Sequence, residues 1–245
     1  MTAVTVRAPL RERKATAPGQ ARTPFHSPPL VRLLAGLDPS EAPAAARPQA
    51  SVGERLGAWL DWTDAIALSQ VLNQPPAASP AARRPGAQAQ AAAALARVRD
   101  DLSRAILQEP ALQPDGIGTD AAPDPADIRR AAQARQRAMA AAIGPLRAQL
   151  RGLLATTSPA GAQLAALDAT LEAALAEQER HHLGAVVQRL ERHVRQAQAA
   201  AASDWRTRAL HTVRQVLLAE LDLRLQPAQG LLDAMNAPDT QGDAA

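Results

Sequence analysis

The sequence predicts an all-α protein, an elongated helical bundle built on a long antiparallel helical hairpin. The chain of 245 residues is rich in Ala, Leu, Arg and Gln, which favour helices. Residues that favour strands are scarce, since there is no tyrosine and Phe25 is the single phenylalanine. Apolar side chains also recur at helical spacing over long stretches, so each helix has one side to bury.

Composition divides the chain into five segments. Residues 1–22 show no periodicity, so we expect a disordered basic tail. Residues 23–73 form an N-terminal helical segment that caps one end of the bundle, with Asp61 or Thr63 starting its last helix. The segment 74–88 contains four prolines and predicts a linker. Residues 89–236 form the helical bundle, and 237–245 form a disordered tail.

Helix start signals define the bundle. Asp124 precedes Pro125, and Ser158 precedes Pro159, which are strong N-terminal signals. They predict helices over 125–155 and 159–200 that are antiparallel neighbours, because only a short turn joins them. Helices over 88–109 and 204–225 pack along this hairpin, and Pro227 ends the last one.

The hairpin turn also predicts which polar residues meet across it. A turn centred near residue 157 places Arg147 and Arg151 close to Asp168. Farther from the turn, Arg135 interrupts the apolar stripe of the first helix. At the same height, the second stripe is interrupted by Gln178, Glu179 and His182. We therefore predict a structural polar layer in which Arg135 bonds to Glu179 or Gln178 and fixes the register of two alanine-rich helices.

The high isoelectric point does not indicate a large positive charge. The computed value is near 10.7, but the formal net charge is only +3. Lys14 is the only lysine, and without Tyr or Cys almost nothing titrates between neutrality and about pH 12. Five basic residues and one acidic residue lie in residues 1–24, which leaves the rest of the chain at a net charge of −1.

Composition also limits the chemistry and the location of the protein. The absence of cysteine excludes disulfides and cysteine-based metal or redox sites. No apolar run approaches the length of about 20 residues that spans a bilayer, so we expect no membrane insertion. The basic N-terminus lacks the apolar region of a secretory signal, and we expect a cytoplasmic protein.

The sequence offers no catalytic motif, and we expect no catalytic residue, cofactor or resident metal. Glu179 and His182 have the Glu-x-x-His spacing of di-iron bundles, but the second such pair is missing. A metal-dependent enzyme with ligands around Glu179 and His182 therefore remains one alternative. An arginine-mediated nucleic-acid-binding protein is another, through the N-terminal tail, Arg83-Arg84 and Arg129-Arg130. We consider nucleic acid an unlikely partner because aromatic residues for base stacking are almost absent.

Tryptophans are the candidate anchors for a partner protein. Trp59 lies on an apolar helix face and is expected in the core. Trp62 and Trp205 lie at helix starts, where they either fill the core or anchor a partner.

Four segments together resemble an uncharacterised bacterial family, a domain of unknown function. They are 23–37 (TPFHSPPLVRLLAGL), 57–73 (GAWLDWTDAIALSQVLN), 141–155 (AAIGPLRAQLRGLLA) and 216–232 (VLLAELDLRLQPAQGLL). The resemblance implies no catalytic residue in this chain. It implies service to a cell-envelope complex, because such proteins are encoded beside envelope and membrane proteins.

These observations favour a non-catalytic helical adaptor or assembly protein. The protein would act through contacts with another protein, a component of an envelope complex. Such helices are also compatible with a homo-oligomer. The contact would use the long hairpin or the N-terminal tryptophan segment.

Overall fold

The computed structural model describes residues 28–37, 52–73, 86–113 and 124–236. These residues form seven α-helices and one short 3-10 helix, without a strand among them, so the predicted all-α class is confirmed. The predictions for residues 1–22, for most of the 74–88 linker and for 237–245 lie outside the described residues. The helices are α1 (Pro29–Leu37), α2 (Val52–Trp59), α3 (Trp62–Asn73), α4 (Ala87–Leu107), η2 (Pro110–Leu112), α5 (Pro125–Leu154), α6 (Pro159–Ala200) and α7 (Trp205–Asn236).

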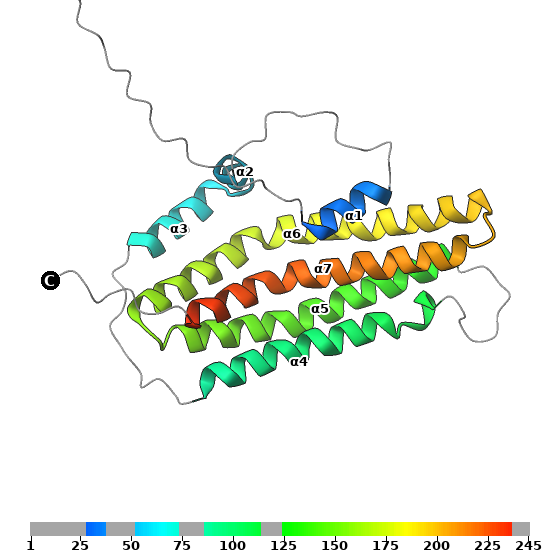
Figure 1. The fold of residues 1–245 in the computed structure, drawn as a ribbon. Helices are drawn as coiled ribbons and strands as arrows, with labels where there is room; N and C mark the ends of the chain where they lie inside the picture. The colour runs from blue at the N-terminus through cyan, green and yellow to red at the C-terminus, as the bar shows by residue number, and fades with distance from the viewer. Residues whose placement is uncertain (1–27, 38–51, 74–85, 114–123, 237–245) are drawn as a thin grey trace, which may run out of the picture.

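The predicted hairpin is formed by α5 and α6, which pack along one another (Figure 1). Both predicted N-caps are present. The Asp124 side chain accepts a hydrogen bond from the backbone N–H of Ala126 at 2.8 Å, and the Ser158 hydroxyl accepts one from Gly161 at 3.0 Å. Each cap satisfies a backbone donor that the helix itself leaves unpaired.

Gly161 lets the two helices approach closely at the turn. A Cβ atom at this position would lie 2.6 Å from the backbone oxygen of Leu154 and 2.6 Å from the Thr157 hydroxyl. We expect Gly161→Ala to lower the free energy of unfolding by about 1–3 kcal/mol, because backbone must move to admit the methyl group. Urea denaturation measures this change. Gly152→Ala is the control, since nothing lies within 4 Å of its Cβ position, and it should be neutral or stabilising. Equal effects of the two substitutions would contradict the prediction.

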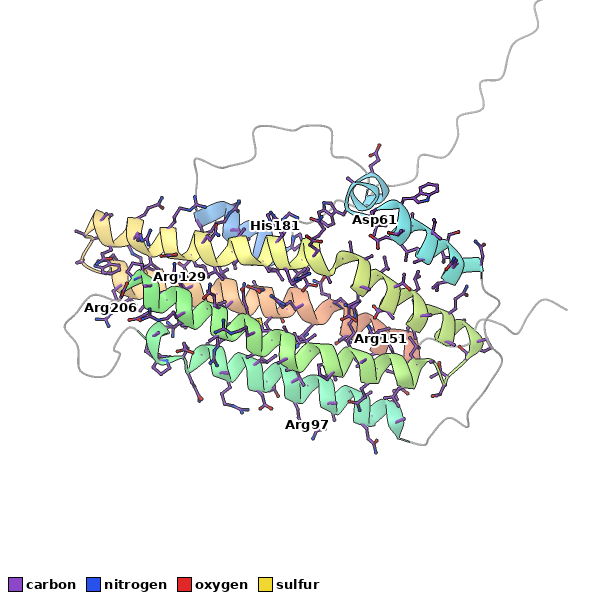
Figure 2. The ribbon with its side chains drawn as sticks, turned by 180° about the vertical axis from the view of Figure 1, so that it is seen from behind. Asp61, Arg97, Arg129, Arg151, His181 and Arg206 are labelled. Carbon is purple, nitrogen blue, oxygen red and sulfur yellow. The ribbon has the colours of Figure 1, made fainter. Side chains whose placement is uncertain are left out.

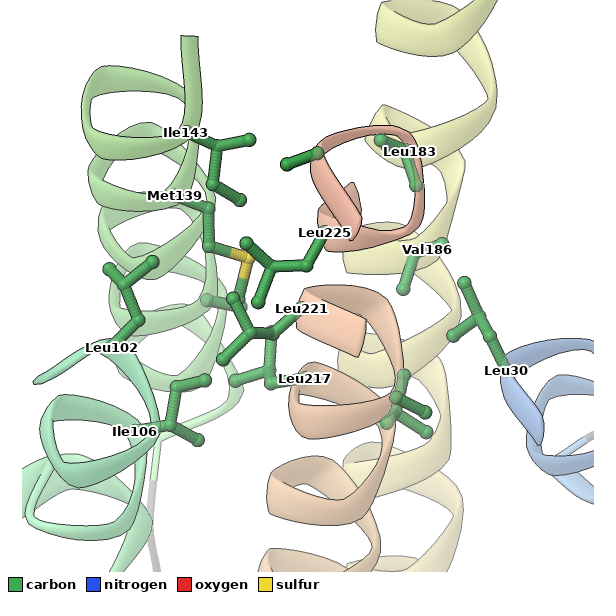
Figure 3. Packing of buried hydrophobic residues seen from close by; sticks show 14 of the residues in the cluster. Leu30, Leu102, Ile106, Met139, Ile143, Leu183, Val186, Leu217, Leu221 and Leu225 are labelled. Atoms are coloured by element: carbon green, nitrogen blue, oxygen red, sulfur yellow. The ribbon is translucent and has the colours of Figure 1, made fainter. Parts of the chain in front are cut away.

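The bundle has two central helices and two flanking ones. α5 and α7 contact each other along the middle, and α4 and α6 lie on opposite sides of this pair (Figure 1). Two short turns connect α5 to α7 through α6, so α5 and α7 run in the same direction. Aliphatic side chains from α4, α5 and α7 meet between these helices, with α6 and α1 closing the other side (Figure 3): Leu102, Ile106, Met139, Ile143, Leu217, Leu221, Leu225, Val186 and Leu30.

The sequence predicts that the last helix ends before Pro227, and this prediction is wrong. α7 continues through Pro227 to Asn236. Proline costs a helix interior about 3 kcal/mol. Beyond it, however, Ala228, Leu231, Leu232 and Met235 are all buried at helical spacing. Because burying each large side chain contributes about 1.5–3 kcal/mol, the core outweighs the local preference of proline.

The N-terminal helices lie along the side of the bundle and not over one end. α1 packs against α6 and α7, and α3 packs against α6 (Figure 1). The Gln163 side chain of α6 donates hydrogen bonds to the backbone oxygens of Val71 and Leu72, at 3.3 and 3.0 Å. These carbonyls lie at the end of α3, where the helix itself offers them no N–H donor. Gln163 therefore links this end of α3 to the bundle.

Candidate functional site: the polar core and the apolar face of α3

A buried polar layer crosses the bundle at mid-length, and its centre is Glu220 of α7. This side chain is fully buried, with an exposed fraction of 0%. Gln136 of α5 donates from Nε2 to Glu220 Oε2 at 3.0 Å and to the Leu183 backbone oxygen of α6 at 2.9 Å. Arg224 donates from Nε to Glu220 Oε1 at 2.9 Å. We call Gln136, Glu220 and Arg224 the polar core, since they join α5, α6 and α7 through hydrogen bonds.

The polar residues predicted from the sequence are placed differently from the prediction. Arg135 does not meet Glu179 or Gln178. Its Nε lies 3.2 Å from Glu109 Oε2, in the segment that follows α4. Glu179 lies 3.5 Å from Nη1 of Arg224 on α7. Gln178 is partly buried and takes no part in the polar core, and His182 is exposed. A polar layer is present, but the pairing proposed for Arg135 is wrong.

The error arises from the register of the hairpin. Counting from the turn placed residue 135 opposite residue 179, whereas the observed contact joins Gln136 to Leu183. Adjacent residues on a helix point about 100° apart, and at this height Gln136, not Arg135, is directed at α6 and α7. The signal for Glu220 was present in the sequence. It stands three residues after Leu217 within an apolar stripe, with Arg224 four residues further on the same face.

A second ion cluster joins α5 to α6 near their turn, as predicted. Asp168 accepts hydrogen bonds from Arg147 Nε at 2.8 Å and from Arg151 Nη1 at 3.0 Å. Glu172 lies 3.4 Å from Arg147 Nη1. Burial opposes the charge of Arg151, but its hydrogen bonds to Glu172 and Asp168 raise its pKa above the ordinary value. Arg151 therefore stays charged, and the cluster links α5 to α6.

The start of α3 carries a reciprocal cap. Asp61 accepts a hydrogen bond from the backbone N–H of Asp64 at 2.8 Å, and the Asp64 carboxylate accepts one from the N–H of Asp61 at 3.2 Å. The Thr63 hydroxyl donates to Asp61, and this bond with that of the Asp64 amide holds the pKa of Asp61 below its usual value. Asp61 therefore stays ionised at neutral pH and keeps α3 capped.

The outer side of α3 is an exposed apolar face. Trp62 is 80% exposed, Leu72 58% and Ile66 41%. Leu68 and Val71 are half-buried instead, on a helix that packs against α6. We call Trp62, Ile66 and Leu72 the α3 apolar face. Trp62, the largest side chain of this face, is therefore exposed to water, and no residue of α3 is fully buried.

The other two tryptophans have different surroundings. Trp59 was expected in the core, but it is 45% exposed and its ring lies 5.5 Å from that of His182 on α6. It holds the end of α2 to α6 and is not a core residue. Trp205 packs against the hydrophobic core at the start of α7, which leaves it less available as a partner anchor than Trp62.

The described residues show no gathering of metal ligands. No group of three His, Asp or Glu side chains among them lies close enough to hold a metal ion. Glu179 and His182, the Glu-x-x-His pair, contact Arg224 and Trp59 respectively. None of the helices in this part of the chain combines the length and apolar character needed to cross a membrane.

In the described residues, helix order and polar core together define an all-α bundle of four long helices, with α1 and α3 packed on its side. The chain belongs to the family described as Protein of unknown function (DUF3348), whose model matches residues 17–237. No curated protein and no solved structure matches the chain.

Proposed function

We propose that this protein is a non-catalytic helical adaptor or assembly protein that binds another protein through the α3 apolar face. The observation that carries the proposal is the exposure of Trp62. Tryptophan is enriched among the residues that dominate binding energy at protein interfaces. Covering an exposed tryptophan of about 200 Å² contributes on the order of 4 kcal/mol.

The surroundings of Trp62 support a binding role. The reciprocal cap of Asp61 and Asp64 holds the start of α3, and Gln163 holds its end. The face is therefore presented on a helix fixed at both ends, which lowers the conformational cost of association. The family resemblance adds the expectation that the partner belongs to a cell-envelope complex and is met in the cytoplasm.

The proposal predicts that Trp62→Ala, alone or with Ile66→Ala, abolishes partner capture. We expect affinity for the captured protein to fall by at least about 30-fold, because an interface anchor contributes about 2 kcal/mol or more. The measurement is a pull-down from the native host with mass spectrometry, followed by titration of the purified pair.

Leu107→Ala is the matched control, because Leu107 is 48% exposed on α4, away from α3. It should capture the same partner as the unmodified protein. Circular dichroism should show all variants equally helical, since neither Trp62 nor Ile66 is buried. If Trp62→Ala and the unmodified chain retain the same proteins with the same affinity, the α3 apolar face is not the binding site.

A further inference from the structure

Charge is unevenly distributed along α6 and the start of α7, although the net charge of the chain is small. Between residues 180 and 214, from the middle of α6 to the first third of α7, there are seven arginines against Glu191 and Asp204. The first half of α6, residues 159–179, holds four acidic residues and no basic one. The charges of these two segments nearly cancel in the sum, and Arg147, Arg151 and Arg224 neutralise much of the acidic segment.

The fold concentrates the positive charge further. The end of α6 and the start of α7 are joined by a short turn, and α5 begins beside them. Figure 2 shows Arg129 of α5 and Arg206 of α7 at this same end of the bundle. We call this region the basic end. Its arginines come from three helices: Arg129, Arg130, Arg195, Arg206, Arg208 and Arg214.

The carboxylates at the basic end are fewer than its arginines, although Asp127 pairs with Arg130 at the start of α5. Buried Glu191 is shared by two of them, with its Oε2 3.8 Å from Arg129 Nη1 and its Oε1 bonded to Arg195. Asp204 pairs with Arg208 at 2.7 Å. Within the described residues, Nε of Arg206 is buried without a hydrogen-bond acceptor. Burial lowers the pKa of His193, so this histidine adds no charge at neutral pH.

Two of these arginines occupy an unfavourable local position. Arg206 and Arg208 lie in the first turn of α7, which contains no acidic residue. The helix dipole places positive charge at this end, so arginines here oppose helix stability. An anion bound at the basic end would remove this conflict, because helix N-termini and arginines both favour phosphate oxygens.

The surface composition identifies the kind of anion. A protein interface usually has an apolar core, and a lipid-binding surface usually inserts apolar side chains. The exposed large apolar residues of the described chain lie on α1, α2, α3, α4 and the first turns of α6, and none lies among the arginines of α5, α6 and α7. Single strands would require exposed aromatic residues for stacking. Duplex nucleic acid is different, because its phosphate backbone presents only charged and polar atoms.

We infer that the basic end binds the phosphate backbone of duplex nucleic acid, without recognition of base sequence. This surface lies apart from the α3 apolar face, so the inference is independent of the adaptor proposal. The adaptor could then hold a partner protein and a nucleic acid on the same rigid bundle.

The test is fluorescence anisotropy of a labelled mixed-sequence duplex titrated with the full chain. We expect dissociation constants of about 1–100 μM at low salt, and a linear fall of log affinity with log salt concentration. Arg206→Gln combined with Arg208→Gln should weaken binding at least about 10-fold and reduce the salt slope by about 2, as two phosphate contacts are lost. The double variant should fold normally, because the two positive charges that it removes are unfavourable at the N-terminus of a helix.

Arg97→Gln combined with Arg104→Gln is the matched control, because it removes two charges from α4 and should leave binding unchanged. If both double variants bind the duplex with the same affinity as the unmodified chain, the basic end is not the binding site. The N-terminal basic tail is then the segment that binds the duplex. Absence of salt-dependent binding overturns the inference. Tighter binding to vesicles with about 30% anionic lipid, or to poly-glutamate, than to the duplex also overturns it, in favour of a membrane or an acidic protein.

Discussion

Replacing Glu220 with alanine should lower the free energy of unfolding by about 3–5 kcal/mol, the cost of breaking a buried ion pair. Glu220 has no exposed surface and accepts hydrogen bonds from both Gln136 and Arg224. Its removal leaves the guanidinium of Arg224, whose side chain is only 13% exposed, without its closest counterion. It also leaves one donor of Gln136 unpaired. Chemical denaturation at neutral pH measures the change.

Two comparisons isolate the polar core. Asp222→Ala is the control on the same helix, because Asp222 is 63% exposed and 3.7 Å from Arg99, and it should cost less than about 0.5 kcal/mol. Replacing Glu220 and Arg224 together with leucine should cost much less than Glu220→Ala, since no buried charge is left unpaired. The prediction fails if Glu220→Ala and Asp222→Ala are equally mild, or if the double leucine variant is less stable than Glu220→Ala.

Replacing Asp168 with alanine should lower the free energy of unfolding by about 2–3 kcal/mol. This carboxylate bonds to Arg147 and Arg151, whose side chains are only 13% and 18% exposed, so its loss leaves two poorly solvated arginines. Glu172 can keep one of them paired, and for that reason we expect a smaller effect than at Glu220. Denaturation of Asp168→Ala, of Arg147→Ala and of the double variant gives the coupling energy directly.

The control for this cluster is Asp127→Ala. Asp127 pairs with Arg130 on the surface of α5, and both side chains are more than half exposed. We expect a loss below about 0.5 kcal/mol, as is usual for exposed pairs. Additive effects of Arg147→Ala and Asp168→Ala would show that the two residues are solvated separately, in contradiction to the prediction.

The sequence alone was sufficient wherever local chemistry decided the structure. Asp124 and Ser158 predicted two helix starts, because a side-chain acceptor and a following proline act within one turn of chain. The same short turn determined which residues meet next to it, so Arg147, Arg151 and Asp168 were correctly placed together.

Register away from the turn required the tertiary structure. Arg135 lies several helical turns from the connection, where it pairs with Glu109 while the adjacent Gln136 contacts α6. Pro227 shows the same limit. Its local preference predicts a helix end, but the burial of Leu231 and Met235 decides otherwise.

Surface properties were also decided only by the tertiary structure. Trp62 has the apolar character of a core residue, but it stays exposed on α3 although this helix packs against α6, and Trp59 is exposed at the end of α2. Likewise, a net charge of +3 contains no information on where charges gather. The sequence determined the helices because hydrogen bonds and caps act between near neighbours. The tertiary structure determined the burial of Glu220, the exposure of Trp62 and the location of the basic end, because each depends on which helix faces lie against one another.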